Sequence, residues 1–301
     1  MSAPRLSIGI TTRNRPDALA DCLASLAALR DLCPEVLIFD DGSDPPVQAR
    51  SPEIDVRVLR DPASPGYIVG RNRLMREAAA PYVLLLDDDT RVLSAGSVER
   101  GLAVLEGDAA VAAVAFAQAE ADGRPWPIAM QPSTADFACV IPSFIGFAHL
   151  LRRDVFLALA GYREDFVYYG EEKDYCLRLI DAGHRTVYLP DALVSHVPDA
   201  AGRSRTRYLR FVSRNDCLNA LYNDPFPRVL WTLPARFLLY FRMRRGWGIQ
   251  DPWGWAWIAR EVAMRAARAA FRRRPVSRAT LRTWRALRVA PQPYHVPGSR
   301  P

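Results

Sequence analysis

Two short apolar runs in the first hundred residues each end at a group of aspartates. Val83 to Leu86 is followed by three carboxylates at residues 87–89, and Val36 to Phe39 by two at residues 40–41. A run this short and this uniformly apolar is typical of a parallel strand that is buried on both faces. Such a strand needs helices on both sides of its sheet, so the two runs predict an α/β fold with acids at the carboxyl ends of its strands.

The surrounding segments alternate between strand and helix patterns. Leu6 to Thr11 and Ile54 to Leu59 are predicted strands, a helix is predicted from Asp17, and Pro65-Gly66 opens another that reaches Ala79. This alternation predicts a Rossmann-like, doubly wound and mostly parallel sheet with helices on both faces. We expect this domain to span residues 1–200 and a C-terminal helical extension to span residues 201–301.

The pattern changes after the aspartates at 87–89. A helix near Ser97 to Leu105 and an apolar run from Ala109 to Phe116 continue it, but residues 118–150 are rich in proline and aromatic residues. This region predicts short strands and loops around a pocket, lined by residues 144–147. Beyond it we expect a helix from Glu171 to Ala182 that is capped by Gly183. A strand at residues 186–189 and a segment at 193–197, which carries His196, are expected to close the domain.

Three adjacent carboxylates repel one another, so the aspartates at 87–89 need a partner that takes up negative charge. In open α/β sheets ligands bind at the carboxyl edge of the strands, and carboxylate oxygens suit a hard divalent cation. A metal site is therefore predicted here. A solvated acidic turn is the alternative explanation of these aspartates taken alone.

Five motifs stand in a fixed order between residues 5 and about 200. They are TTRNRP at residues 11–16, DDGS at 40–43, GYIVGRN at 66–72, LDDD at 86–89 and GEEKDYCLRL at 170–179. Each motif is short, but in this order and spacing they resemble the inverting glycosyltransferases of family 2. Members of that family have the GT-A fold, carry a DXD motif and use nucleotide-diphosphate sugars.

The resemblance implies roles for individual residues. Those implied to hold the nucleotide and its ribose are Thr11, Arg13, Asp40, Asp41, Arg71, Asp87 and Asp88. Asp89 is the first predicted ligand of a metal ion on the diphosphate, and His196 stands where some members place another ligand. A structural role is the alternative for this lone histidine. The implied cofactor is Mn²⁺ or Mg²⁺, and the implied donor is a UDP-, dTDP- or GDP-sugar.

The expected chemistry needs a base as well as a metal. Cleavage of a sugar-diphosphate bond leaves charge on the diphosphate, which a divalent ion stabilises, while the attacking hydroxyl must lose a proton. Glu172 is the predicted base, and Glu171, Asp174 and Gly146 are predicted to lie on the acceptor side. The pair at 171–172 stands where the family more usually has a glutamate and an aspartate or two aspartates, so the choice between the glutamates stays open. The dipole of a helix N-terminus is the alternative explanation of this acidic cluster.

We therefore predict a metal-dependent inverting enzyme that moves a hexose or deoxyhexose, as rhamnosyl-, galactosyl- or glucosyltransferases do. The predicted acceptor is a hydroxyl of a glycan or lipid-linked molecule, in the assembly of cell-envelope polysaccharide or glycolipid. A nucleotidyltransferase and a non-catalytic sugar-nucleotide-binding protein are the alternatives. A haloacid-dehalogenase phosphatase is disfavoured because Arg91 replaces the required threonine or valine and the only lysine, Lys173, lies among acids. No GxGxxG or P-loop motif indicates an oxidoreductase or ATPase.

Composition limits the cellular setting. Half of the 301 residues are hydrophobic, enough for one large core and a modest appendage. The first residues lack the basic segment and apolar core of a signal peptide, so a cytoplasmic location is predicted. The cysteines are scattered without a CxxC pair and are predicted to be buried thiols: Cys22, Cys33, Cys139, Cys176 and Cys217.

Positive charge is concentrated in the last hundred residues. Residues 1–200 carry 19 basic and 29 acidic groups, net −10, whereas residues 201–301 carry 21 arginines and four acids, net +17. The chain is predicted to be helical from Arg203 as far as Pro225. The segment from Val229 to Phe241 is apolar, but Pro234 and Arg236 break the apolar run, and it is too short to span a bilayer.

Four tryptophans, at 247, 253, 255 and 257, precede an arginine-rich amphipathic segment at 260–274. Tryptophan beside arginine on a helix suits the headgroup layer of a membrane, so we predict peripheral association with the inner face of the cytoplasmic membrane. Packing on the catalytic domain and a homodimer contact are the alternatives. Nucleic acid is not a predicted partner, because no recognition motif accompanies the charge.

Overall fold

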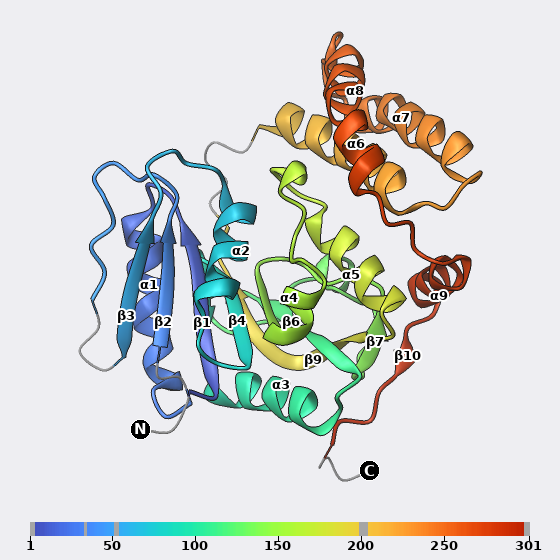
Figure 1. Ribbon diagram of the computed structural model, residues 1–301. Coiled ribbons are helices and arrows are strands. Elements are labelled where there is room, and N and C mark those ends of the chain that lie inside the picture. The colour runs from blue at the N-terminus through green and yellow to red at the C-terminus, as the bar shows by residue number, and fades with distance from the viewer. Residues whose placement is uncertain (1–3, 33–34, 51–53, 199–203, 298–301) are drawn as a thin grey trace.

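A mixed sheet with helices on both faces forms the centre of the computed structural model (Figure 1), which describes residues 4–32, 35–50, 54–198 and 204–297. Ten strands of these residues follow the order β10-β7-β9-β6-β8-β4-β1-β2-β3, with β5 paired to β9 beside this path. The strands are β1 Leu6–Thr12, β2 Glu35–Asp40, β3 Asp55–Arg60, β4 Tyr82–Asp87, β5 Thr90–Val92, β6 Val111–Ala119, β7 Cys139–Ile141, β8 Ala148–Arg152, β9 Arg185–His196 and β10 Gln292–Pro293.

The helices cover the sheet and continue into the C-terminal part of the chain. They are α1 Pro16–Ser25, α2 Tyr67–Glu77, α3 Ala95–Gly107, α4 Arg153–Ala158, α5 Glu171–Asp181, α6 Arg205–Asn223, α7 Val229–Gly246, α8 Gly254–Arg272 and α9 Arg278–Val289. Three short 3₁₀ helices are η1 Leu26–Leu29, η2 Ile128–Met130 and η3 Glu164–Phe166.

The inner strands in the first half of the sheet are largely apolar because both of their faces are buried. In β4, Leu84 and Leu86 pack with α1 and α3 on one face, while Val83 and Leu85 pack with α2 on the other. The order β3-β2-β1-β4 is parallel, which confirms the predicted α/β class. On β1, Thr11 is the register partner of Asp87 and Thr12 that of Asp40. Both groups of aspartates therefore reach the same edge of the sheet.

The second half of the sheet is mixed. Strand β8 lies antiparallel between β4 and β6, and β9 is parallel to β6 but antiparallel to β7 and β5. The strand predicted at residues 186–189 is present but longer than expected, because β9 continues through most of the segment at 193–197. The pairing register shifts between Phe116 and Ala117 of β6, so that Leu189 and Leu193 of β9 pair with consecutive residues.

The C-terminal part, from α6 onward, packs on the preceding α/β part of the chain instead of standing apart from it (Figure 1). Leu218 and Tyr222 of α6 belong to the same core as Phe166 and Tyr175. Helix α9 contacts α5, and β10 pairs with β7, so the chain returns to the edge of the sheet. The expected extension is helical, and packing on the catalytic domain, one of its alternatives, is what these contacts show.

Several local features of this part were not predicted individually. The apolar run at residues 229–241 lies in helix α7, which continues through Pro234 to Gly246. Helix α9 and strand β10 were not predicted. Arg203, the predicted start of α6, lies outside the described residues, as does Cys33; the other four cysteines are free and buried, as expected. Every helix of the described segments is too short or too polar to cross a lipid bilayer.

Candidate active site

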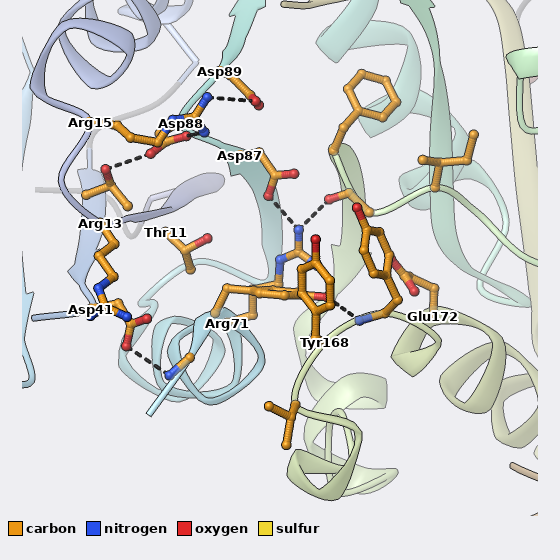
Figure 2. A pocket seen from close by; sticks show the side chains of 18 of the residues that line it. Thr11, Arg13, Arg15, Asp41, Arg71, Asp87, Asp88, Asp89, Tyr168 and Glu172 are labelled. Carbon is orange, nitrogen blue, oxygen red and sulfur yellow. Dashed lines mark hydrogen bonds and ion pairs between the residues drawn. The ribbon is translucent and has the colours of Figure 1, made fainter. Parts of the chain in front are cut away.

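A cavity of about 680 Å³ opens at the carboxyl ends of β1, β2 and β4 (Figure 2). It is closed on the other side by α5, by the loop before α5 and by the first turn of α6. Most of the predicted site residues line it: Thr11, Arg13, Asp41, Arg71, Asp87, Asp88, Asp89, Gly146, Glu172 and His196. The predicted lining segment at residues 144–147 also lies in the wall, which confirms that expectation.

One end of the cavity is formed by Asp41, Arg13 and Gly66 (Figure 2). The backbone N–H of Gly66 donates to Asp41 Oδ1 at 2.9 Å, which fixes the loop that leads into α2. Gly66 has a φ of +98°, a conformation that side chains rarely adopt. Burial raises the pKa of Asp41, and the nearby charge of Arg13 opposes this shift. This end therefore offers a carboxylate and a cation beside a fixed loop.

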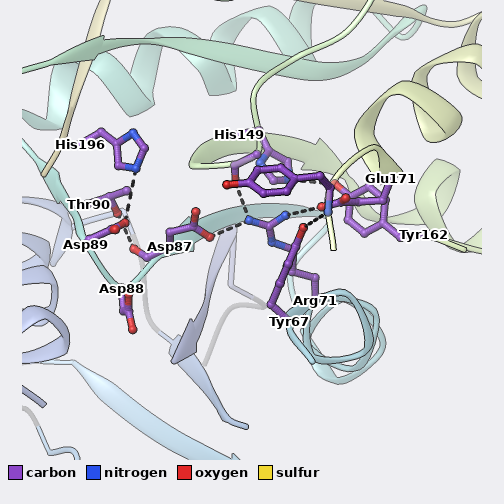
Figure 3. Close-up of polar contacts among 12 residues, drawn as sticks. Tyr67, Arg71, Asp87, Asp88, Asp89, Thr90, His149, Tyr162, Glu171 and His196 are labelled. Atoms are coloured by element: carbon purple, nitrogen blue, oxygen red, sulfur yellow. Dashed lines mark hydrogen bonds and ion pairs between the residues drawn. The ribbon is translucent and has the colours of Figure 1, made fainter. Parts of the chain in front are cut away.

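Asp87, Asp89 and His196 come together at the end of β4. One ligand atom from each lies within 4.8 Å of the other two, and His196 Nε2 is 3.6 Å from Asp89 Oδ1 (Figure 3). Strand pairing produces this geometry, because Thr90 of β5 is the register partner of His196 on β9. Two carboxylates and an imidazole are a donor set that suits a divalent cation such as Mn²⁺.

The surroundings of His196 hold its ring in place. Its Nδ1 lies 2.7 Å from Gln118 Oε1, and an amide oxygen at that distance favours a proton on Nδ1. The ring is stacked between Trp126 and Phe147, with centroid distances of 5.4 and 5.0 Å. With Nδ1 protonated, the lone pair of Nε2 faces Asp89, as a metal ligand requires.

Asp88 lies in the wall but is bound by protein groups. Thr12 Oγ1 donates to Asp88 Oδ2 at 2.7 Å, and Arg15 binds both Asp88 and Asp89, the latter at 3.1 Å. Burial raises the pKa of Asp88 to about 7. Arg15 is a site residue that the sequence analysis did not single out, although it stands within the TTRNRP motif.

Arg71 connects the aspartates with α5 (Figure 3). Its buried guanidinium donates to Asp87 Oδ1 at 2.6 Å, to the carbonyl of Gly146 at 2.6 Å and to Glu171 Oε1 at 3.1 Å. Burial alone would lower the pKa of Arg71, but the carboxylates of Asp87 and Glu171 raise it. Arg71 therefore stays charged and fixes the spacing between the end of β4 and the start of α5.

The two glutamates at the start of α5 differ in position. Glu171 is fully buried against Arg71, whereas Glu172 lines the cavity. A Cβ atom on Gly146 would lie 2.4 Å from Glu172 Oε1, so a larger residue at 146 would force this carboxylate to shift. Burial raises the pKa of Glu172, and Arg71 opposes the shift. Of the two candidates for the base, Glu172 is the one that faces the cavity.

Three predicted residues do not reach the cavity. Asp40 is buried and accepts hydrogen bonds from the backbone N–H groups of residues 43 and 47 and from Arg60. Asp174 is buried between Arg163 and Arg178, and Glu171 is held by Arg71. The expected contacts of Asp40 with the nucleotide, and of Asp174 and Glu171 with the acceptor, need correction because these carboxylates are fully buried and lie outside the cavity lining.

The structure adds a wall that the sequence analysis did not predict. Tyr67 from α2, Tyr168 and Tyr169 from the loop before α5, and Arg207 and Tyr208 from α6 line the cavity. Only Tyr67 belongs to one of the five motifs, GYIVGRN. The wall is completed because α6 folds back onto the α/β part of the chain, and local sequence carries no signal for that contact.

Comparison with known proteins identifies the family. The model of the family described as "Glycosyl transferase family 2" matches residues 7–160, just over half of the 301 residues. The chain belongs to this family. This is the family that the order of the five motifs predicts.

The chain has curated relatives of greater length. It is 31% identical over 209 residues to the pre-mycofactocin glycosyltransferase of Mycobacterium tuberculosis, an alignment that covers 64% of this chain and 42% of the relative. The chain thus spans less than half the length of that relative.

Solved structures share its fold. The Pyrobaculum calidifontis mannosyltransferase PcManGT in complex with GDP-Man and Mn²⁺ gives a TM-score of 0.57 at 16% identity, over 96% of this chain and 81% of that one. S. aureus TarS 1–349 in complex with UDP-GlcNAc gives 0.61 at 15% identity, over 94% and 88%. These similarities confirm the predicted GT-A fold.

Proposed function

We propose that this family 2 glycosyltransferase is a metal-dependent inverting enzyme that transfers a hexose or deoxyhexose from a nucleotide diphosphate to a hydroxyl group. The observation that carries the proposal is the arrangement of one cavity. Asp41 and Arg13 lie at one end, Asp87 lies between them and Glu172 at the start of α5 (Figure 2), and Asp89 and His196 are grouped with Asp87. From Arg13 to Glu172, these three groups of residues suit, in that order, a nucleotide, a diphosphate with its metal ion and an acceptor hydroxyl.

Asp87, Asp89 and His196 would hold a divalent cation, Mn²⁺ or Mg²⁺. When bound, the ion would neutralise the charge that develops on the leaving diphosphate. The chain supplies the geometry. Gln118 orients His196, Arg15 holds Asp89, and the donor set fits a cation with mixed oxygen and nitrogen ligands.

Glu172 takes the proton of the acceptor hydroxyl as that oxygen attacks the anomeric carbon. Glu172 is the second residue of α5, the glycine at 146 leaves space for its carboxylate, and the contact of Arg71 with Glu171 holds the start of the helix. Among the described lining residues, the other carboxylates gather at the ends of β2 and β4, so Glu172 stands alone on the α5 side. One base and no carboxylate nucleophile on that side support a single displacement, which inverts the anomeric carbon.

We propose a chemical class for the donor and one for the acceptor. UDP-, dTDP- and GDP-sugars are the proposed donors, and the UDP-GlcNAc and GDP-Man complexes of the two similar structures support this class. The proposed acceptor is a glycan or lipid-linked molecule of the cell envelope. The exposed apolar residues of α7 and α8, with the positive charge around them, support a peripheral position on the inner face of the cytoplasmic membrane.

A thermal-shift screen tests the proposal. A nucleotide sugar at 100 times its Kd should stabilise the protein by about 2.7 kcal/mol, and Mn²⁺ or Mg²⁺ should increase that stabilisation. Asp89→Ala should remove the metal-dependent part and leave the shift by nucleotide alone. A large shift with NAD or ATP, and none with any nucleotide sugar, would contradict the proposal. The anomeric configuration of the product, read by NMR, tests inversion.

A further inference from the structure

One wall of the cavity is built from side chains that the proposed chemistry does not use. Tyr168 lies in the loop before α5, and Arg207 and Tyr208 lie in the first turn of α6. This turn is fixed, because Ser204 caps the helix by accepting from the backbone N–H of Arg207.

Aromatic contacts hold the Arg207 side chain. Its guanidinium carbon lies 4.8 Å from the ring centroid of Tyr168 and 5.7 Å from that of Phe211. Tyr208 is supported in turn, because its ring stacks on Trp247 at 5.7 Å and meets Tyr169 edge-on at 4.8 Å. A guanidinium that rests on a ring face keeps its in-plane N–H groups free to bind an anion.

The charge of Arg207 is not neutralised within the protein. Arg15 and Arg71, two other arginines of the lining, are tied to aspartates and a glutamate. Arg207, in contrast, forms no ion pair with any carboxylate of the described residues and is exposed. An ordered, unneutralised cation at the edge of a cavity is a ready site for a phosphate or a carboxylate.

This wall lies on the acceptor side. Tyr168 and Glu172 lie at one end of the cavity, and Arg13 and Asp41 lie at the other (Figure 2). Glu172 is also close enough to Tyr208 for its charge to act on the tyrosine hydroxyl. An acceptor that presents its hydroxyl to Glu172 must therefore extend along Tyr168, Arg207 and Tyr208.

We propose that Tyr168, Arg207 and Tyr208 form a subsite for an acceptor that carries an anionic group, a phosphate or a carboxylate, near its reactive hydroxyl. The inference rests on the proposed function and adds the acceptor's chemical class to it. Arg207 binds the anion through its N–H groups, and the tyrosine rings face the apolar side of the acceptor sugar.

Three matched probes test this subsite: glucose, glucose 6-phosphate and glucuronate. Their affinities are measured by calorimetry on the full chain, saturated with Mn²⁺ and the nucleotide diphosphate that gives the largest thermal shift. At least one charged probe should bind tenfold or more tightly than glucose, since hydrogen bonds to charged groups are worth about 1.5–3 kcal/mol. The stronger of the two charged probes identifies the anion as phosphate or carboxylate.

Two variants test whether Arg207 causes the preference for a charged probe. Arg207→Gln should abolish the preference for the charged probe and leave the nucleotide-induced thermal shift unchanged. Arg205→Gln, an equal charge change in the same helical turn but outside the cavity lining, should keep the preference. Equal affinity for all three probes, or no binding of either charged probe, overturns the inference.

Two further outcomes separate this inference from the proposed function. If Arg207→Gln weakens the nucleotide diphosphate and not the charged probe, Arg207 serves the donor, and the inference is overturned. If no nucleotide stabilises the wild-type protein, the proposed function itself fails. A normal nucleotide shift without any preference for anionic probes overturns the subsite alone.

Discussion

Adjacent residues at the start of α5 have different surroundings although the helix dipole acts on both. Glu171 is fully buried and paired with Arg71, while Glu172 is partly exposed in the cavity. Successive residues on a helix are about 100° apart, so two neighbouring side chains point in different directions. The dipole favours a carboxylate at either position, but only the position of Glu172 gives a base access to an acceptor.

We expect Glu172→Gln to lower turnover by roughly a hundredfold to ten-thousandfold, the range for a positioned general base. Affinity for the donor, measured by calorimetry, should hardly change, since the amide keeps the size of the side chain. Glu171→Gln is the matched control. It weakens the contact with Arg71, so it should lower the melting temperature more than it lowers turnover. Loss of activity in the Glu171 variant, with near wild-type turnover in the Glu172 variant, would transfer the role of base to Glu171.

The pH dependence of turnover provides an independent test of Glu172. Burial raises its pKa above the usual range for glutamate, and Arg71 opposes that shift. A base works only when ionised, so kcat should rise with pH through the raised pKa. The acid limb of the kcat profile should therefore lie above about 4.3, the value for a free glutamate. The residual activity of Glu172→Gln should lack this limb. A profile that is flat from pH 4 to pH 7 in the wild type would be incompatible with the assignment.

At the scale of elements, the loop between η3 and α5 holds Glu172 in place through an unusual backbone. Val167 and Tyr169 have φ values of +60° and +63°, and Gly170 follows at +88°. A β-branched residue in this region is strained by about 1–3 kcal/mol. Asn215 of α6 compensates, because its Nδ2 donates to the carbonyls of Phe166 and Tyr168 at 3.0 and 2.8 Å and also contacts that of Tyr169.

Asn215→Ala should therefore lower kcat by tenfold or more while the donor Kd stays within twofold. The loop would relax and move Glu172, whereas the nucleotide end of the cavity does not contact Asn215. Asn219→Ala is the matched control, because Asn219 is a buried asparagine one turn further along the same helix that makes no hydrogen bond to this loop among the described residues. Steady-state kinetics and calorimetry give the two readouts. If Asn215→Ala costs stability but keeps kcat, the residue supports the fold and does not position the base.

Local signals account for the parts that the sequence predicted well. The parallel strands are short apolar runs, and the acids follow them directly, so both the α/β class and the edge that carries the site are readable from spacing. The direction in which a side chain points is harder to predict. Side chains alternate across a strand, so Asp40 points into the protein while Asp41 faces the cavity. The sequence alone does not say which of the two aspartates faces the cavity.

Long-range contacts account for what was missed. Strand β10 forms only because the C-terminal segment returns to β7. The cavity wall that contains Arg207 forms only because α6 packs against α5. Helix α7 also tolerates Pro234, which lies on its exposed side. Tertiary packing decides each of these features, so sequence periodicity could not predict them.

At the scale of the whole molecule, charge and apolar exposure lie together at the C-terminal end. Helix α7 packs inward through Val229 and Tyr240 but exposes an apolar stripe at a spacing of three to four residues. The exposed residues of this stripe are Leu230, Trp231, Pro234, Leu238 and Phe241, followed by Arg242 and Arg245. Helix α8 exposes Trp255, Met264 and Phe271 beside further arginines. Exposed apolar side chains rimmed by arginine match an anionic bilayer surface, whereas a water-facing helix would be polar there.

We therefore expect the protein to float with vesicles that contain anionic lipid and to stay unbound with neutral vesicles. Salt should weaken the binding, because screening shortens the reach of the arginine charges to about 3 Å at 1 M. The double variant Trp231→Glu and Leu238→Glu should lose flotation, since it places two carboxylates on the apolar stripe. Ile128→Glu with Met130→Glu is the matched control, because these residues are similarly exposed but lie in η2, outside the C-terminal helices. Equal flotation of both double variants would rule out this stripe as the membrane contact. A change from dimer to monomer in the α7 variant, without any vesicle binding by the wild type, would assign the stripe to a contact between two copies of the chain.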